Sequence, residues 1–325
     1  MGEIKRILDT DGKPTFDYRG ALRSLARQLL NGEGLIFLGA GAAAGTVDGT
    51  SLPTASDLSR KFAKECRLEW HEYVPLSTVA FYYESFFSRD ELNAFLRENL
   101  NNPKAKPSKT ITTLVELVAL FERKGVQALI VTTNYDDHFE RAYEKVFGYR
   151  PEVIIYNGGT DANDDAAHLH PGIRHPHLWL PKKPTYLYKM HGCISQATGR
   201  NLVITEEDYI NFLSNALSHN EHKRLLPYVL ANITEWPTLF VGYSLSDWNF
   251  RVIYKATAER SGTRSYAVQL FTPKEGDETQ SARWNATVGF WGKKNVDIIN
   301  VDASTFMQDL LASVQELVES SPDRT

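Results

Sequence analysis

The sequence predicts an α/β fold in which helices cover both faces of a Rossmann-like, mostly parallel sheet. Short apolar runs such as LIFL (35–38) have the composition of buried strands, and they alternate with longer segments whose apolar residues recur at helical spacing. This alternation is typical of parallel strands joined by crossover helices. With 325 residues, of which 42% are hydrophobic and 23% charged, the chain is long enough to bury a sizeable core.

The elements follow one another in a regular order. A helix is expected at 17–31, before the strand at 35–38. Three more helices are expected before the next strand, at 56–66 with Ser56 as the N-cap, at 86–100 and at 108–124. The later strands are expected at 126–133, 185–192, 238–244, 265–271 and 296–302, and an amphipathic helix is expected at 303–319.

These elements predict a single domain over residues 1–325. Its core spans about 34–302, with a helical segment at 1–33 before it and the helix at 303–319 after it. Residues 151–184 are rich in Gly, Pro, Asp and His, so they are predicted to form an insertion rather than part of the core.

Composition excludes several classes of protein. The net charge of −4 provides no basic field for a nucleic-acid backbone, so direct nucleic-acid binding is not expected. Cys66 and Cys193 are too few for a disulfide framework or a four-cysteine zinc site, which suits a reducing compartment. The N-terminus has no signal-peptide pattern and no window has the apolar length of a membrane span, so we expect a cytoplasmic protein that does not bind membranes.

The first strand runs directly into a glycine-rich turn. Gly39, Gly41 and Ala44 form a G-x-G-x-x-A pattern, in which glycine allows a tight turn and a close approach of backbone N–H groups to a pyrophosphate. The pattern alone is weak evidence, because similar turns occur where a strand only packs against a helix. An acidic residue at the end of a second strand about 20 residues later, typical of dehydrogenases, is missing.

Polar residues also follow three other apolar runs. These ends are TTNYDD (132–137), HG (191–192) and GYSLSD (242–247). Ligands of open α/β sheets bind beyond the carboxyl ends of the strands, so residues from these ends are candidates for one site.

Four motifs occur in the order found in the Sir2 (sirtuin-like) family: a strand followed by GAG, then TTNYD, then HG, and then GYS. The chain resembles this family from about residue 34 to about 300. The resemblance implies that NAD+ is bound, as a substrate, and that the catalytic residues are Asn134, Asp136 and His191. Gly39, Ala40 and Gly41 are then expected at the phosphates, and Gly242 and Ser244 near the adenosine half. The full set of implied NAD+-binding residues is Gly39, Ala40, Gly41, Ala42, Thr133, Gly242, Tyr243, Ser244 and Asp247.

Two departures from the protein deacetylases of that family affect the expected function. A four-cysteine zinc module usually follows their His-Gly pair, whereas a single cysteine follows it here, which implies no zinc ribbon and no metal. Their Phe-Arg pair is missing from TSLPTASDL (50–58). VITEEDY (203–209) is similar to the bacterial Sir2-like branch whose members hydrolyse NAD+, many of them in anti-phage defence.

The candidate residues suit cleavage of the nicotinamide–ribose bond. Nicotinamide leaves as a neutral molecule, so the reaction needs a base and a stabilised oxocarbenium-like transition state rather than a general acid. His191, with an ordinary pKa of about 6.5, suits the base. Asn134 is expected to hold the ribose or water, and Asp136 to favour positive charge. We therefore expect an NAD+ glycohydrolase that releases ADP-ribose and nicotinamide and depletes NAD+ in anti-phage defence.

Other functions stay open. The same fold suits a non-catalytic module that senses NAD+ or ADP-ribose, or a zinc-free NAD+-dependent protein deacylase. His168, His170, His175 and His177 form a cluster without carboxylate or cysteine companions, so a solvated loop is expected there rather than a metal site.

Control of such an enzyme is expected to come from outside the catalytic core. Constitutive NAD+ consumption would kill the host, and the resemblance covers most of the chain. The segments 1–33 and 303–319 have apolar faces that suit packing within the domain or on a neighbour. The resemblance implies a homo-oligomer that works with a separate regulatory protein, such as a HerA-like ATPase or a short Argonaute.

Overall fold

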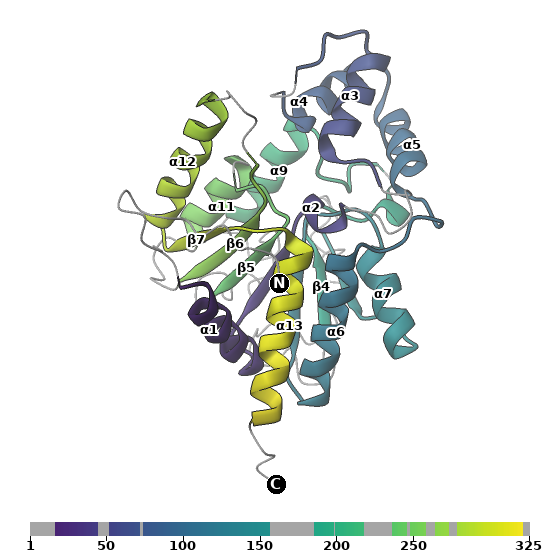
Figure 1. The fold of residues 1–325 in the computed structure, drawn as a ribbon. Helices are drawn as coiled ribbons and strands as arrows, with labels where there is room; N and C mark the ends of the chain where they lie inside the picture. Colours follow the sequence, from purple (N-terminus) through teal and green to yellow (C-terminus); the bar gives the residue numbers. More distant parts are fainter. Residues whose placement is uncertain are drawn as a thin grey trace.

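A seven-stranded parallel sheet forms the centre of the protein (Figure 1). The computed structural model describes residues 17–44, 52–71, 74–156, 185–197, 199–217, 236–245, 248–257, 264–272 and 278–320. The strand order is β3-β4-β2-β1-β5-β6-β7. The strands are β1 (Leu35–Leu38), β2 (Ala128–Thr132), β3 (Glu152–Ile155), β4 (Thr185–Lys189), β5 (Thr238–Val241), β6 (Ser265–Gln269) and β7 (Val296–Asn300).

Helices cover both faces of the sheet, as the sequence predicts. Side chains alternate along each strand: Ile36 and Leu38 of β1 pack in the core on one face, and Leu35 and Phe37 pack in the core on the other. The first face is covered by α1 (Tyr18–Leu30), α6 (Lys109–Arg123), α7 (His138–Phe147) and α13 (Ala303–Ser320). The second face is covered by α9 (Glu206–Leu217), α11 (Trp248–Thr257) and α12 (Glu278–Gly292).

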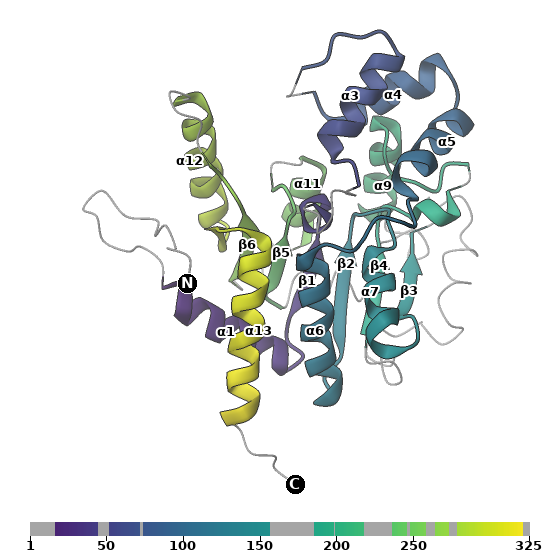
Figure 2. The same ribbon diagram turned by 45° about the vertical axis from the view of Figure 1, so that its right-hand side comes forward.

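Three further helices form a separate lobe above the carboxyl ends of the strands (Figure 2). Their apolar side chains pack on the segment 194–204, which follows β4. Arg89 reinforces this contact, because its guanidinium donates to the Asp208 carboxylate at 2.7 Å and to the Leu202 carbonyl at 2.7 Å. The lobe consists of α3 (Ala55–Glu65), α4 (Leu76–Phe86) and α5 (Arg89–Leu100). None of the described helices has the length and apolar character needed to cross a membrane.

Local capping explains where these helices begin. The expected N-cap Ser56 is wrong: α3 begins one residue earlier, because Thr54 and Asp57 form a capping box. Ser88 caps α5 by accepting from the Glu91 amide, so the helix expected from residue 86 begins at Arg89. The structure also contains α4, α9 and α12, which the sequence pattern did not predict.

The predicted insertion at 151–184 needs a correction at its start. Residues Glu152–Ile155 form β3, which pairs with β4 at the edge of the sheet. They therefore belong to the core, although they lie beside a segment rich in turn-forming residues. Residues 157–184 of the predicted insertion, including the four-histidine cluster, lie outside the described residues.

The glycine turn after β1 packs against the turn after β5. The Gly39 amide donates to the Val241 carbonyl at 3.0 Å, and the Gly41 amide donates to the Gly242 carbonyl at 2.8 Å. A Cβ atom at Gly41 would lie 2.8 Å from that carbonyl oxygen, and one at Gly242 would lie 2.1 Å from the Ala42 nitrogen. Glycine is needed here because two backbone segments touch.

Replacement of Gly242 by alanine tests this contact. Gly242 has a φ of +63°, and Gly148, at the C-terminus of α7, has a φ of +76°, but a Cβ atom at Gly148 would meet no other described residue within 4 Å. Both alanine variants bear the cost of a left-handed conformation, but only Gly242→Ala adds a steric overlap. We expect Gly242→Ala to lower the free energy of unfolding by about 2 kcal/mol more than Gly148→Ala. Urea denaturation measures both, and equal losses would contradict the packing role.

Candidate active site

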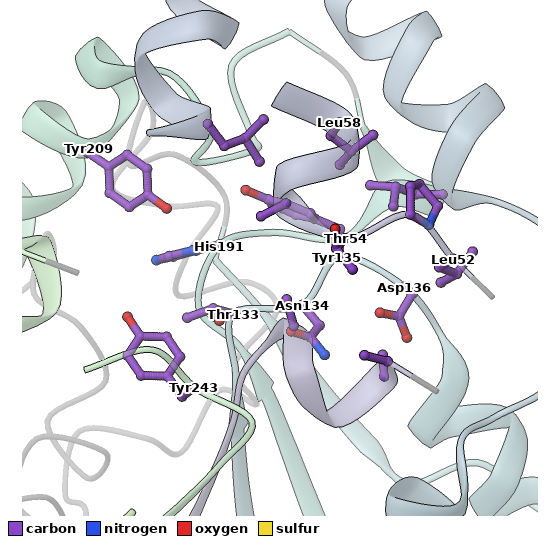
Figure 3. A pocket seen from close by; sticks show the side chains of 17 residues that line it. Leu52, Thr54, Leu58, Thr133, Asn134, Tyr135, Asp136, His191, Tyr209 and Tyr243 are labelled. Carbon is purple, nitrogen blue, oxygen red and sulfur yellow. The ribbon is translucent and has the colours of Figure 1, made fainter. Parts of the chain in front are cut away.

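A cavity of about 150 Å³ lies beyond the carboxyl ends of four adjacent strands (Figure 3). Residues that follow β1, β2, β4 and β5 form one side of it, and residues of the helical lobe form the other. Because the chain leaves β1 toward β2 and later returns to its other side as β5, this is the crevice where open α/β sheets bind ligands. The lining residues are Ala40, Ala43, Ala44, Leu52, Pro53, Thr54, Ala55, Leu58, Leu76, Leu100, Thr133, Asn134, Tyr135, Asp136, His191, Tyr209 and Tyr243.

The turn after β2 brings Asn134 to the cavity. Its backbone amide donates to the Thr132 hydroxyl at 3.0 Å, which fixes the residue as it leaves the strand. The side-chain Oδ1 of Asn134 is buried and has no hydrogen-bond partner within the described part of the chain. A buried acceptor without a donor is costly, so a donor brought by a ligand or a water molecule is favoured there.

Asp136 joins the cavity wall to the start of α7. Its carboxylate accepts a hydrogen bond from the His138 amide at 3.0 Å, and its Oδ1 lies 4.0 Å from the His138 Nδ1. Burial lowers the pKa of His138 more than the neighbouring Asp136 carboxylate raises it, so His138 is neutral at pH 7. Asp136 therefore provides a carboxylate at the cavity without a protonated histidine beside it.

A buried ion pair lies behind this turn. The Lys189 ammonium is fully buried and donates to the Glu140 carboxylate at 2.8 Å and to the Asp136 carbonyl. Burial by itself would lower the pKa of Lys189, but Glu140, Cys193 and Asp136 together outweigh it and the pKa lies above its ordinary value. Lys189 is therefore charged, one hydrogen bond behind the cavity wall.

His191 lies in the turn after β4, in an aromatic environment. Its ring meets the rings of Tyr209 and Phe212 edge to face, with centroid distances of 5.2 and 5.4 Å. Figure 3 shows the Tyr209 hydroxyl pointing toward the His191 ring. Burial lowers the pKa of His191 to about 3. The pKa of His191 in the free protein therefore lies below the ordinary value of about 6.5, and His191 is neutral throughout the physiological range.

The structure brings together six of the predicted site residues at the cavity. Asn134, Asp136 and His191 line it, as do Ala40, Thr133 and Tyr243. Gly39, Gly41, Ala42, Gly242 and Ser244 do not line it, and Asp247 lies outside the described residues.

The glycine turn also packs against the turn after β5. The amides of Gly39, Gly41 and Ala42 donate to backbone carbonyls, which gives this turn a packing role in the structure. The expected approach of Gly39 and Gly41 to a pyrophosphate stays a prediction, and Ala40, which lines the cavity, stays a candidate for ligand contact.

Sequence reasoning missed several residues of the site. Tyr209 lies in the VITEEDY segment, but the pattern gave no reason to place its ring against His191. The apolar wall consists of Leu52, which precedes α3, and of Leu58, Leu76 and Leu100 of the lobe, and only the packing of the lobe brings it to the cavity. Within the described ranges, no group of three or more His, Cys, Asp or Glu side chains is arranged to hold a metal ion.

Comparison with known proteins gives one family match. A family model described as a SIR2-like domain matches residues 128–299, just over half of the chain, which includes the turns after β2 and β4. A solved structure described as "Structural Basis for the Mechanism and Regulation of Sir2 Enzymes" has a TM-score of 0.45 and 14% identity, covering 94% of this chain and 100% of that one. "The structure of Sir2Af2 bound to a myristoylated histone peptide" has a TM-score of 0.44 and 14% identity, covering 93% and 99%. No curated protein matches the chain.

The low pKa of His191 predicts a pH dependence of stability. The folded-state pKa is about 3, and the unfolded-state value is about 6.5. The unfolded protein therefore binds an extra proton between these values, and stability that is fully present above pH 6.5 is lost as the pH falls. We expect wild type to lose roughly 1.4 kcal/mol per pH unit relative to His191→Gln below pH 6. Urea denaturation of both proteins from pH 7.5 to 5 measures this, and parallel pH curves would contradict it.

Proposed function

The chain belongs to the SIR2-like domain family, and from that premise we propose that it is an NAD+ glycohydrolase. The family includes NAD+-dependent enzymes. The proposed reaction converts NAD+ and water into ADP-ribose, nicotinamide and a proton. The observation that carries the proposal is the convergence of Asn134, Asp136 and His191 on one cavity from two adjacent strand ends.

The dimensions and polarity of the cavity support the nicotinamide riboside end of NAD+ as its occupant. A cavity of about 150 Å³ has room for one six-membered aromatic ring. The apolar lobe residues suit the flat faces of such a ring, and Asp136 suits its positive charge and its carboxamide. The unpartnered Oδ1 of Asn134 suits a ribose hydroxyl as donor.

The proposed chemistry uses the neutrality of His191. As the nicotinamide–ribose bond breaks, its electron pair leaves with nicotinamide and positive charge develops on the ribose. The Asp136 carboxylate stabilises this charge, and a neutral His191 does not oppose it. The same ring accepts the proton of the attacking water as the new C–O bond forms, a role that requires the pKa of His191 in the NAD+ complex to be higher than in the free protein. A protonated histidine at this position would repel the cationic substrate.

One observation favours a second candidate, an NAD+-dependent protein deacylase. The apolar lobe wall at Leu52, Leu58, Leu76 and Leu100 is a surface on which an acyl chain fits. The two functions differ in their requirement for an acylated peptide. A non-catalytic NAD+ sensor, in turn, would bind the nucleotide without consuming it.

The resemblance to NAD+-hydrolysing members of anti-phage systems supports a biological role for the proposed activity. We propose that the protein depletes NAD+ in bacteria under phage attack, as a homo-oligomer controlled by a separate protein. A HerA-like ATPase or a short Argonaute is the proposed kind of controlling partner.

Substitution at the cavity tests the proposed hydrolysis. Purified wild-type protein is expected to release nicotinamide and ADP-ribose from NAD+ without a peptide, as measured by chromatography. Asn134→Ala and His191→Gln are each expected to lower the rate at least about 100-fold, since both remove a group that acts on the reacting ribose or water. His191 is buried, so glutamine is preferred to alanine because it leaves a smaller cavity.

Matched controls are Asn99→Ala and His71→Gln, at residues that do not line the cavity; both are expected to keep wild-type rates. Full activity in Asn134→Ala or His191→Gln would contradict the mechanism. Release that requires an acylated peptide would favour the deacylase.

A further inference from the structure

The buried ion pair between Lys189 and Glu140 lies outside the residues assigned to the reaction. Lys189 is the last residue of β4, and Glu140 lies in the first turn of α7. Their side chains are 0% and 6% exposed, and the ammonium is 2.8 Å from the carboxylate. Desolvation of two charges is costly, so a buried pair of this kind is weak evidence for a purely stabilising role.

The position of Lys189 connects the turns that carry the site. Lys189 is in register with Thr132, two residues before Asn134, and it precedes His191 by two residues along its own chain segment. Its ammonium also donates to the Asp136 carbonyl. A single side chain thus holds the turn after β2 against the strand that leads to His191.

The charge of Lys189 poses a problem for a cationic substrate. The Asp136 carbonyl accepts from Lys189, while Asp136 itself lines the cavity, so the ammonium lies directly behind the wall. Charges this close interact strongly at the low effective dielectric of a buried site. An uncompensated ammonium would oppose both the pyridinium of NAD+ and the positive charge that develops on the ribose.

We propose that Lys189 and Glu140 are positioning residues of the NAD+ site: Lys189 fixes the turn that carries Asn134 and Asp136, and Glu140 cancels the charge that a cationic substrate would otherwise meet. This inference rests on the proposed function in one respect, that the substrate carries a pyridinium. It assigns neither residue a contact with the substrate. Lys189 acts through its hydrogen bond to the backbone of the turn, and the pair acts on the substrate through its electrostatic field.

The charge effect is measured by comparing two ligands. One is the carbocyclic analogue of NAD+, which keeps the pyridinium but has a methylene group in place of the ribose ring oxygen and is not hydrolysed. The other is ADP-ribose, which lacks the pyridinium. Calorimetric titration at pH 6.5, where a low pH favours the protonated ammonium of Lys189, gives the ratio of the two Kd values for each variant. A general loss of structure weakens both ligands and leaves this ratio unchanged.

Glu140→Gln is expected to raise the ratio of the analogue Kd to the ADP-ribose Kd by about tenfold, because it leaves the ammonium unpaired. In the double variant Lys189→Met/Glu140→Gln both charges are gone, and the ratio is expected to return to within about threefold of wild type. Glu140→Asp keeps the charge but draws it back by one methylene group. Its expected intermediate ratio provides the test if Glu140→Gln does not fold.

Glu122→Gln is the matched control. Glu122 of α6 accepts from Thr185 at 2.5 Å at the opposite end of β4, so its replacement removes a carboxylate that contacts the same strand at the end away from the cavity. Its ratio is expected to equal that of wild type. A ratio in Glu140→Gln or Glu140→Asp that matches Glu122→Gln would overturn the inference, as would an equal rise in the double variant.

These outcomes are distinguishable from those of the proposed hydrolysis. If wild type binds the analogue but does not cleave NAD+, the proposed glycohydrolase activity is contradicted, and the Kd ratios still test the role of the ion pair. Wild type that cleaves NAD+ but shows unchanged ratios in the Glu140 variants would remove the ion-pair inference alone. Wild type that binds neither ligand would overturn both.

Discussion

The site depends on backbone hydrogen bonds that continue the parallel sheet beyond the ends of its central strands. The Met190 amide donates to the Thr132 carbonyl at 2.9 Å, and the Thr133 amide donates to the Leu38 carbonyl at 3.2 Å. On the other side of β1, the Gly39 amide donates to Val241. The four turns are therefore held in register at the carboxyl ends of the strands. Because the strands are adjacent, the polar residues that follow them lie close together.

Glycine and aromatic residues make this edge close enough to form a cavity. Gly41 and Gly242 let two backbones touch, which a side chain at either position would prevent. Tyr209 and Phe212 surround His191 and remove it from water, so its neutral state follows from packing rather than from a charged neighbour. The helical lobe closes the other side, where Arg89 ties α5 to the segment that leads into α9. Packing thus sets the electrostatics of the site.

The sequence predicted the parts of this structure that local pattern determines. The parallel sheet with helices on both faces is confirmed, and so are α1 and α6 to within a residue or two. The strand β3 was missed because Pro151 and a turn-rich segment flank four residues. The helix α12 was missed because its apolar residues do not lie on one face, and within it only Trp291 is fully buried.

For the site, the strand ends indicated that Asn134, Asp136 and His191 are neighbours, and all three line the cavity. The ion pair between Lys189 and Glu140, by contrast, depends on how α7 lies against β4, which the sequence does not show. The lysine within an apolar strand was the one sequence feature that pointed to a buried charge.

The central claim is that this cavity holds the nicotinamide riboside end of NAD+. A crystal structure of the protein with the carbocyclic NAD+ analogue tests it most directly. The account predicts density for the nicotinamide ring between the lobe and the turn after β2, a ribose hydroxyl within hydrogen-bonding distance of Asn134 Oδ1, and His191 facing the anomeric carbon. Density for the analogue elsewhere on the protein, with the cavity at the carboxyl ends of β1, β2, β4 and β5 filled only by water, would contradict it.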